Sequence, residues 1–147
     1  MTFRGHYEHS LDSKDRLTIP ARFRAALADG VVVCAGLDPC VELYPTAGYA
    51  RFEEQVLGEL SPLTRHGRMM RRRFHGQSHD ETLDSAGRIR IPRHLIEHAE
   101  LQEGPCVVIG VADHLEIWNP HSWADHDAEI VATAAEIAEE LAGGRPG

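Results

Sequence analysis

LDSKDRLTIP at residues 11–20 occurs a second time, with few changes, as LDSAGRIRIP at residues 83–92. Six of the ten aligned positions are identical, and both copies read Asp-Ser-x-x-Arg followed by a hydrophobic residue, a variable residue, Ile and Pro. Polar turn residues followed by alternating hydrophobic residues are typical of a tight turn that leads into a short strand. An internal repeat of this kind indicates that the chain is built from two copies of one unit.

The similarity extends on both sides of the repeated motif. Upstream, FRG at 3–5 resembles FHG at 74–76; downstream, at an offset of 74, residues 30–33 align with 104–107 and 41–44 with 115–118. A unit of about 55 residues is too small to bury much apolar surface alone, so the two copies are predicted to complete one shared core. We expect a first unit at 1–60, a connecting basic helix at 61–73, a second unit at 74–131 and an acidic tail at 132–147.

In both copies the turn is predicted to lead into a short strand, at 17–19 and 89–91, which ends at a proline. Proline suits the first turn of a helix, and apolar residues recur at helical spacing after it, so short helices are expected at 21–27 and 93–99. β-branched runs then predict two hairpins, which pair 31–34 with 40–44 and 106–111 with 114–118.

Two further helices are expected, after Pro45 and after Pro120. Apolar stripes at helical spacing pack against a core far more often than they bind a ligand. Acidic residues dominate the second of these segments, which predicts a solvated helix that frays over 143–147. The stripes consist of Tyr49, Phe52, Val56 and Leu60 in the first helix and of Trp123 and Ile130 in the second.

Composition limits the location and the redox state. No apolar run reaches the roughly 18 residues that a membrane span requires, and MTFRGHYEHS at the start lacks the apolar segment of a signal peptide. We therefore expect a cytoplasmic protein without membrane contact. Cys34, Cys40 and Cys106 lie in apolar runs and form no Cys-x-x-Cys pair. Buried, reduced thiols are expected in preference to disulfides or metal ligands.

The charge is unevenly distributed. The formal net charge is -8, which by itself argues against nucleic acid, because Lys and Arg must neutralise phosphates. Residues 1–75 contain 11 Lys and Arg against 9 Asp and Glu, whereas residues 76–147 contain 4 against 14. The basic groups are concentrated in the half that holds the first motif, and the acidic end is expected to face away from any DNA.

The two Asp-Ser-x-x-Arg turns, the opening FRGHYEHSLDSKDRLTIPARFR and the later VELYP and LEIW closely resemble the MraZ family, from residue 3 to near residue 130. The resemblance implies an α+β fold in which tandem AbrB-like swapped-hairpin units form one pseudo-twofold β-barrel with flanking helices. It also implies a transcriptional regulator, without cofactors, that binds direct repeats in the promoter of the division and cell-wall gene cluster. Assembly into a ring-shaped homo-oligomer and association with the nucleoid would follow.

The same resemblance assigns the residues that contact double-stranded DNA. Arg16 is the strongest candidate for reading the sequence, and Lys14, Arg4, Ser13 and Arg88 are further candidates. An arginine can fork onto O6 and N7 of guanine in the major groove, whereas a lysine contacts phosphate as a point charge. We therefore expect Arg16 to provide specificity and Lys14 to provide affinity.

The remaining motif residues, Asp12, Asp84 and Ser85, are expected to hold the turns. An aspartate in a turn can accept hydrogen bonds from the backbone or from its own arginine. For Arg88, a role that only holds the turn is the favoured interpretation, and for Arg16 it is the alternative to DNA reading.

The two copies differ in charge at the tip of the turn. Lys14 corresponds to Ala86, and Asp15 corresponds to Gly87. Aspartate is among the few residues that tolerate a positive φ, so the first turn can survive this change. An acid beside Arg16 nevertheless weakens phosphate contact. We expect the first turn to read DNA and the second mainly to complete the barrel.

Two other groups of residues invite a functional interpretation. The densest positive charge is at Arg65, Arg68, Arg71, Arg72 and Arg73. A solvated helix face or a subunit contact is favoured there over a second DNA-binding patch. The pairs His6/His9 and His94/His98 have ligand-like spacing, but neither has a Cys or a third His at a recognisable distance, so no metal is predicted.

Two other classes of function are disfavoured. The chain has no nucleophile elbow, phosphate-binding glycine loop or H-E-x-x-H motif, so we expect no enzyme. An antitoxin-like or purely structural module is the other alternative, since AbrB-like hairpins also occur in toxin–antitoxin pairs. The duplication within one chain and the lack of a hydrophobic disordered tail argue against it.

Overall fold

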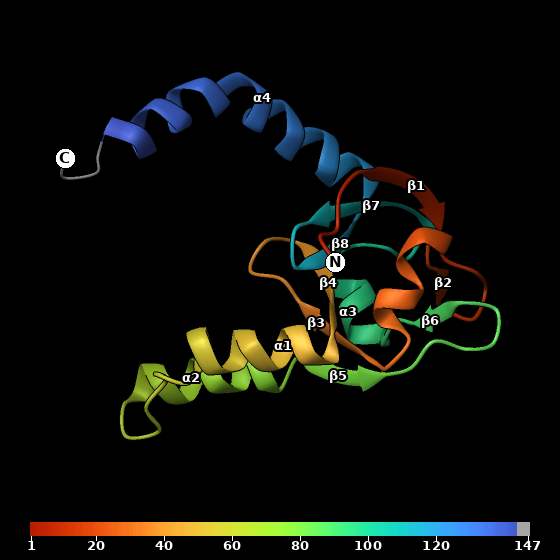
Figure 1. The fold of residues 1–147 in the computed structure, drawn as a ribbon, viewed down its shortest axis with the longest axis horizontal. Helices are drawn as coiled ribbons and strands as arrows, with labels where there is room; N and C mark the ends of the chain where they lie inside the picture. Colours follow the sequence, from red (N-terminus) through yellow and green to blue (C-terminus); the bar gives the residue numbers. More distant parts are fainter. Residues whose placement is uncertain (144–147) are drawn as a thin grey trace.

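The computed structural model describes residues 1–143, which form a six-stranded antiparallel sheet, a separate two-stranded ribbon and several helices (Figure 1). Both predicted hairpins are present, β3 (Val31–Ala35) with β4 (Cys40–Pro45) and β7 (Pro105–Val111) with β8 (His114–Trp118). The ribbon consists of β2 (Arg16–Thr18) and β6 (Arg88–Arg90). The sheet has the order β1 (His6–Ser10), β7 (Pro105–Val111), β8 (His114–Trp118), β4 (Cys40–Pro45), β3 (Val31–Ala35) and β5 (Ser78–Glu81).

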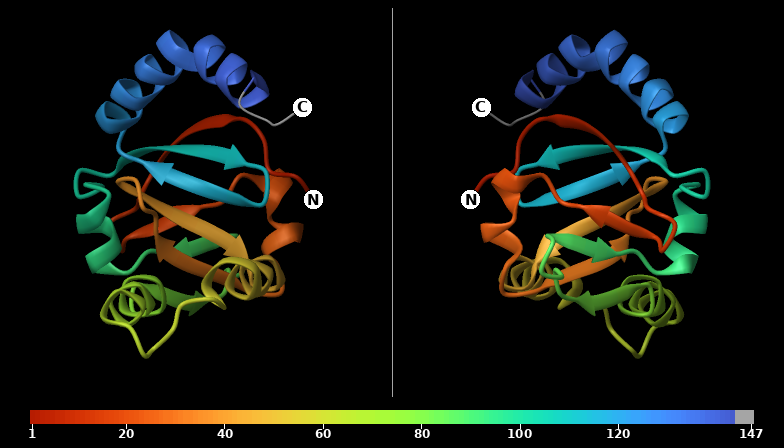
Figure 2. Two further views of the ribbon diagram at one scale, coloured as in Figure 1. Left: turned by 90° about the vertical axis from the view of Figure 1, so that its left-hand side faces the viewer. Right: turned by 90° about the vertical axis from the view of Figure 1, so that its right-hand side faces the viewer.

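The two copies of the repeat exchange their first strands. β1, from the first copy, pairs with β7 of the second, and β5, from the second copy, pairs with β3 of the first. β4 and β8 pair at the centre of the sheet, where Glu42 lies opposite Glu116. Neither copy can complete its half of the sheet alone, so the duplicated sequence folds around one pseudo-twofold axis between β4 and β8 (Figure 2).

The prediction of a closed barrel is wrong, because the sheet is open. β1 and β5 are its edges, and in residues 1–143 the ribbon strands pair only with each other, apart from one isolated bridge between Leu11 and Leu17. Each Asp-Ser-x-x-Arg turn redirects the chain from a sheet edge into the ribbon. The ladder of hydrogen bonds therefore stops at the turns, whereas a barrel would need it to continue around the cylinder.

The main core fills the space between the sheet and the ribbon. Leu17 and Ile89 lie opposite each other in the ribbon and are fully buried against this core. Successive side chains of a strand point to opposite faces. Burial of these two residues therefore fixes the neighbouring ribbon side chains on the solvent side, which positions the candidate site.

The segment after the first motif forms two 3-10 turns, η1 (Ala21–Phe23) and η2 (Ala25–Leu27), where a helix was predicted. Phe23 and Leu27 are both buried, so the tighter turns place both apolar side chains in the core within a few residues. The second copy forms the predicted helix, α3 (Arg93–His98).

A π-type turn changes the predicted stripe of the next helix. α1 (Thr46–Phe52) continues into η3 (Glu53–Leu57). A π turn contains more residues than an α turn, so it shifts which side chains face inward. Leu57 is buried, whereas Val56 is 53% exposed and Leu60 lies beyond the turn. The expectation that Val56 and Leu60 belong to the stripe is therefore wrong.

α2 (Arg65–His75) lies beside α1, and α4 (Pro120–Gly143) leaves the body of the molecule (Figure 1). Trp123 is half-buried, with its ring 5.6 Å from that of Trp118. Ile130 was predicted to pack in the core, but it is 51% exposed because α4 has left the sheet at that point. The acidic segment is the continuation of this single helix.

The structure also bears on the predictions about the cysteines, membrane contact and the C-terminal end. Cys34, Cys40 and Cys106 are free and buried, as predicted. Within residues 1–143, no helix is long and apolar enough to cross a membrane. The fraying predicted over 143–147 falls, apart from Gly143, on residues outside the described part of the chain.

The alignment of the two copies needs a correction of one residue in the first strand of each hairpin. Cys34 pairs with Glu42, and Ile109 pairs with Glu116. Residues of β3 are therefore equivalent to those 75 positions later, because the loop between β3 and β4 is one residue longer than its counterpart. From Cys40 onward the offset of 74 holds.

Candidate nucleic-acid interface

The first turn is held by Asp12. Its Oδ1 accepts hydrogen bonds from the backbone N–H groups of Lys14 (2.9 Å) and Arg16 (3.0 Å), and its Oδ2 accepts one from Nε of Arg16 (2.9 Å). The backbone of the turn closes when Asp12 N–H donates to the Arg16 carbonyl at 2.9 Å. Arg16 therefore leaves the turn in a fixed direction, and in the described residues only its Nε is engaged.

The second turn has the same geometry. Oδ1 of Asp84 accepts from the backbone N–H groups of Ala86 and Arg88, both at 2.9 Å, and Oδ2 accepts from Nε of Arg88 at 2.8 Å. The residue before each arginine has a positive φ, 60° at Asp15 and 74° at Gly87. Asp15 thus adopts the conformation that its glycine counterpart adopts, and the first turn is intact.

The carboxylate of Asp15 is directed to another basic residue. Its Oδ2 lies 3.7 Å from Nη1 of Arg93, the first residue of α3. An exposed pair at this distance contributes little to stability. It nevertheless places a positive charge next to the acid that distinguishes the first turn from the second.

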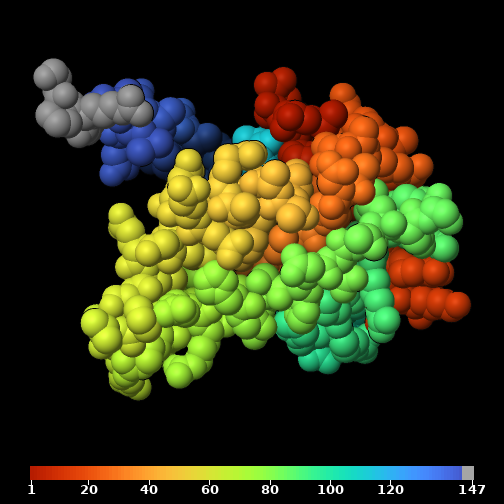
Figure 3. Space-filling model, turned by 60° about the horizontal axis from the view of Figure 1, so that its bottom comes forward, coloured from red at the N-terminus to blue at the C-terminus, as the bar shows by residue number. Residues whose placement is uncertain are grey.

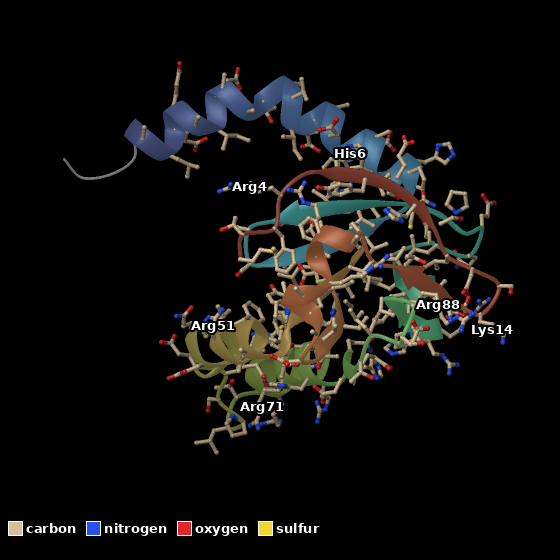
Figure 4. The ribbon with its side chains drawn as sticks, turned by 45° about the vertical axis from the view of Figure 1, so that its right-hand side comes forward. Arg4, His6, Lys14, Arg51, Arg71 and Arg88 are labelled. Atoms are coloured by element: carbon tan, nitrogen blue, oxygen red, sulfur yellow. The ribbon has the colours of Figure 1, made fainter. Side chains whose placement is uncertain are left out.

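The ribbon gathers basic side chains on its solvent side. Arg16 lies opposite Arg90, and Thr18 lies opposite Arg88. All four alternate with buried residues and therefore face outward. Lys14 lies in the adjoining first turn, on the side of the ribbon where Arg16 meets Arg90, and Figure 4 shows Lys14 and Arg88 at the same end of the molecule. The two turns lie at opposite ends of a ribbon only three residues long, so they present their charges together.

Reciprocal backbone hydrogen bonds tie each turn to the opposite strand. The N–H of Ile19 donates to the carbonyl of Gly87, and the N–H of Ile91 donates to the carbonyl of Asp15, both at 2.9 Å. Ile19 and Ile91 are themselves buried in the core. The turns are therefore anchored at their tips as well as at their bases, which limits their motion relative to the ribbon.

The remaining predicted site residues are distributed unevenly. Ser13 and Ser85 are exposed at the tips of the turns, next to the basic face. Arg4 is exposed at the far end of β1, where its backbone packs against Gly110, and Figure 4 shows it well away from Lys14. The structure does not bring Arg4 to the ribbon.

The basic run of α2 is also remote from the ribbon. Figure 3 shows α1 and α2 at one end of the molecule and the segments of the two turns at the other. Arg73 donates from Nη2 to the Gly36 carbonyl at 2.6 Å, and Arg68 donates from Nη1 to the Pro62 carbonyl at 3.0 Å. These two arginines have structural roles, whereas Arg71 is exposed.

Sequence reasoning missed Arg90 and left Arg24 out of the site. Arg90 follows Arg88 by two residues, so the alternation of a strand places both on the same face. Arg24 is half-buried, and its Nε donates to the carbonyl of Ile19 at 3.0 Å, close beside the second turn. The period-two pattern of 88–90 was the signal that could have identified Arg90.

Both turn acids are stabilised in the ionised form. Hydrogen bonds from the Arg16 backbone hold the pKa of Asp12 below its ordinary value of 3.8, opposed by burial and helped by the Lys14 backbone and the Arg16 side chain. The pKa of Asp84 is lowered in the same way by the backbone of Arg88, against burial, and by the side chain of Arg88. A lowered pKa means that ionisation of these groups stabilises the fold.

Acid should therefore weaken both turns. The stabilisation from the two ionised aspartates is fully present above their unfolded-state pKa and is lost as the pH falls through their folded-state pKa. The double variant Asp12→Asn/Asp84→Asn should therefore be less stable than the wild type at neutral pH. Between about pH 5 and about pH 2, its stability should also fall less steeply than that of the wild type. Urea unfolding across this range tests this, with Asp127→Asn on exposed α4 as control. Parallel curves for wild type and double variant would contradict it.

Comparisons with known proteins bear on this repeated motif. The chain matches the family described as "MraZ protein, putative antitoxin-like" twice, over residues 2–73 and 74–143. A protein of Lactiplantibacillus plantarum named transcriptional regulator MraZ is 39% identical over 140 residues, covering 95% of this chain and 97% of the relative. Proteins with the same name from Roseiflexus castenholzii and Pediococcus pentosaceus are 39% and 40% identical, each covering 95% of this chain and 96% of the relative. With both halves matched and relatives aligned over nearly the full length, this chain belongs to the MraZ family.

Proposed function

We propose that this chain is a sequence-specific DNA-binding transcriptional regulator, not an enzyme, and that it contacts DNA through the outer face of the β2–β6 ribbon. The observation that carries the proposal is the convergence of Arg16, Arg88 and Arg90 on one solvent side of an anchored ribbon. The relatives compared above are named as transcriptional regulators. Its targets are direct repeats in the promoter of the division and cell-wall gene cluster, which places it in the cytoplasm, on the nucleoid.

A two-stranded ribbon suits the major groove in size. The groove of B-DNA is about 12 Å wide and admits either a helix or a two-stranded β-ribbon. Arg16 has its Nε fixed by Asp12, which leaves its two terminal nitrogens without a hydrogen-bond partner in the described residues, so they can fork onto O6 and N7 of a guanine. A side chain that is already oriented loses less conformational entropy on binding.

The two turns contribute unequally to the proposed DNA binding. The first combines Arg16 with the exposed Lys14, which reaches phosphate, whereas the second has Ala86 in place of the lysine. The shared geometry of the turns means that Arg88 can also reach DNA, with less support from neighbouring charge. We assign sequence reading mainly to the first turn.

The net charge of -8 does not oppose this function, because the acidic residues are segregated. α4 projects from the molecule on the side away from the ribbon (Figure 1). Charges separated by more than a Debye length of about 8–10 Å are largely screened at physiological salt. The separated acidic residues of α4 are Asp125, Asp127, Glu129, Glu136, Glu139 and Glu140.

An exposed apolar face on α4 supports assembly of several copies. Ile130, Ile137 and Leu141 are 51%, 47% and 67% exposed and lie on one face of the helix. The same helix is acidic, while α2 is basic and carries the exposed Met69. Complementary charge and unpaired apolar surface make α4 of one copy a suitable partner for α2 of the next, and repetition of this contact builds the proposed ring.

The test is binding of the purified full-length protein to the DNA upstream of its own gene. Footprinting should protect short repeats, and the affinity should fall steeply with salt, since each phosphate contact adds about 0.9 to the slope of log K against log salt. Lys14→Ala should lower affinity similarly for all sequences and reduce the slope by about one for each engaged turn. Arg51→Ala, in α1, removes one positive charge far from the ribbon and should leave the slope unchanged. No protection at any salt concentration would overturn the proposal.

A further inference from the structure

Four polar side chains gather at the centre of the sheet, on the face turned away from the main core. Cys40 and Glu42 come from β4, and His114 and Glu116 come from β8. With the offset of 74, Cys40 is the equivalent of His114, and Glu42 is the equivalent of Glu116. The two copies of the repeat thus place two pairs of potential ligands around the pseudo-twofold axis. Figure 2 shows these central strands between α4 and the α1–α2 pair.

The cluster is too buried to be an ordinary surface ion pair. Cys40 is fully buried, His114 is 8% exposed, and the side chains of Glu42 and Glu116 are 20% and 17% exposed. Charged groups at such sites are costly unless they are paired with good geometry.

One ring nitrogen of His114 has a hydrogen-bond partner within residues 1–143, and the other has none. Its Nδ1 lies 2.6 Å from Oδ1 of Asp113. Its Nε2 points between Oε2 of Glu42 at 3.4 Å and Oε2 of Glu116 at 3.5 Å, yet this buried atom has no hydrogen-bond partner in the described residues. A charge-assisted N–H···O bond would be about 2.7–2.9 Å long. The imidazole nitrogen is therefore aimed into the cluster without a partner at bonding distance.

The carboxylates of Glu42 and Glu116 have few polar partners besides His114. Burial disfavours the protonated imidazole, but the carboxylates of Glu116, Glu42 and Asp113 outweigh it and raise the pKa of His114 to about 10. Glu116 receives one further bond, from Nε1 of Trp118 at 2.9 Å, and the nearest partner of Glu42 besides His114 is the Cys34 thiol at 3.9 Å.

Two of the donor spacings match those of ligands bound to a shared metal ion. Two ligands bound to one tetrahedral ion at about 2.0–2.2 Å lie about 3.3–3.6 Å apart, and the two His114–carboxylate distances are 3.4 and 3.5 Å. The group whose donor atoms all lie within 4.8 Å of one another consists of the Cys40 thiol and carboxylate oxygens of Glu42 and Glu116, and His114 joins it through its contacts with the two carboxylates. We propose that Glu42, His114 and Glu116, with Cys40 as fourth ligand, bind a divalent transition-metal ion of the zinc class.

The surrounding residues provide the support that such a site requires. A metal-bound histidine usually donates its other N–H to a carboxylate, which fixes the ring and the tautomer. Asp113 is placed to accept that bond, and Trp118 holds one oxygen of Glu116 while the second lies near Nε2 of His114, where it could bind the ion. The donor set of one nitrogen, one sulfur and carboxylate oxygens suits Zn²⁺ or Co²⁺ better than Mg²⁺ or Ca²⁺.

Binding releases protons in a balanced way. Nε2 of His114 and the thiol of Cys40 each lose a proton to solvent, and the ion takes their places. Burial, together with Glu116 and Glu42, raises the pKa of Cys40 in the protein without metal, but a divalent cation reverses this local field and favours the thiolate. The bound ion would join β4 to β8, and so join the two copies of the repeat to each other.

The test uses purified full-length protein that has been treated with chelator, titrated with Zn²⁺ in a calorimeter and with Co²⁺ in a visible spectrometer. We expect one tight ion per chain, a tetrahedral Co²⁺ spectrum with a thiolate charge-transfer band, and a higher unfolding temperature with Zn²⁺. Glu42→Gln and His114→Gln should abolish tight binding, and Asp113→Asn should weaken it about 10- to 100-fold. Cys40→Ser should remove the thiolate band.

The matched control is a histidine pair, formed by His79 of β5 and His94 of α3, outside the proposed site. Nε2 of His79 lies 2.6 Å from Nε2 of His94, so this pair could bind added metal by itself. His79→Gln should leave the tight site intact. The absence of a tight site in the wild type would overturn the proposal, as would its loss in His79→Gln with retention in His114→Gln. If His114→Gln does not fold, the proposal is tested by the number of ions bound per wild-type chain and by the Co²⁺ spectrum of Cys40→Ser. A wild-type Co²⁺ spectrum without a thiolate band contradicts the site.

Discussion

Arg16→Ala should abolish specific binding to promoter DNA while leaving the fold and the subunit assembly intact. Each bidentate contact between arginine and guanine contributes about 1–3 kcal/mol of discrimination. In the proposed ring, several subunits would bind one fragment with linked affinities, so the losses would multiply and the overall affinity should fall by more than about 100-fold. Mobility-shift titrations at fixed salt, with the mass checked by light scattering, measure both quantities.

Arg88→Ala is the matched comparison, because Asp84 holds Arg88 as Asp12 holds Arg16. If both arginines only held their turns, the two substitutions would lower the unfolding temperature by similar amounts. Each would then change the DNA affinity only through its effect on stability. We expect a small, similar loss of stability in both variants and a larger loss of affinity in Arg16→Ala. Retardation of the promoter fragment by Arg16→Ala at wild-type concentrations would refute the role of Arg16.

Ile130→Lys/Ile137→Lys should convert the assembly to smaller species and weaken promoter binding through that change alone. Both side chains are about half exposed in the single chain, so the substitutions cost little within one copy. In the proposed contact they would place charges in an apolar interface, which is strongly unfavourable. Loss of linked binding should reduce affinity for a multi-repeat fragment about 10²- to 10⁴-fold, with a much smaller effect on a single repeat.

The control for this double variant puts the same two charges on the opposite side of α4. Ala132 and Ala135 lie roughly across the helix from Ile130 and Ile137, given 3.6 residues per turn. Ala132→Lys/Ala135→Lys should keep the wild-type mass and the wild-type preference for several repeats. An unchanged mass for Ile130→Lys/Ile137→Lys would show that the apolar face of α4 does not hold the copies together.

Much of the fold could be predicted from the repeat because the same local physics applies twice. Alternation of buried and exposed residues around Leu17 and Ile89 locates the ribbon, and Asp-Ser-x-x-Arg encodes a turn that its own aspartate closes. Closure of the sheet could not be predicted, since it depends on which edge strands meet. A local pattern contains no information about that pairing.

The helices show where periodicity fails. Val56 fits the stripe of an ideal α-helix, but the π turn at 53–57 buries Leu57 in its place. Ile130 fits a stripe as well, yet an apolar face gives no sign of whether it packs on its own chain or on another. The period of a sequence identifies a face, and only the tertiary structure shows what covers it.

The candidate sites could be predicted from the sequence to different degrees. The turn residues were found by the motif, and Arg90 follows from strand alternation. The alignment of the two copies places Cys40 at the position of His114. A thiol aligned with an imidazole does not by itself suggest that the two residues share a site. No ligand spacing along the chain reveals a site whose members lie 74 residues apart.

The exchange of first strands between the two copies affects how the protein is made. β1 lies near the N-terminus, but its partner β7 lies about 100 residues later, with His6 paired to Ile109. At about 5–20 residues per second of synthesis, the ribosome takes several seconds to deliver that partner after β1 has emerged. During this interval β1 has no partner strand, and β3 lacks β5. The nascent first half should therefore depend on chaperones or on rapid translation to avoid pairing with another unfinished chain.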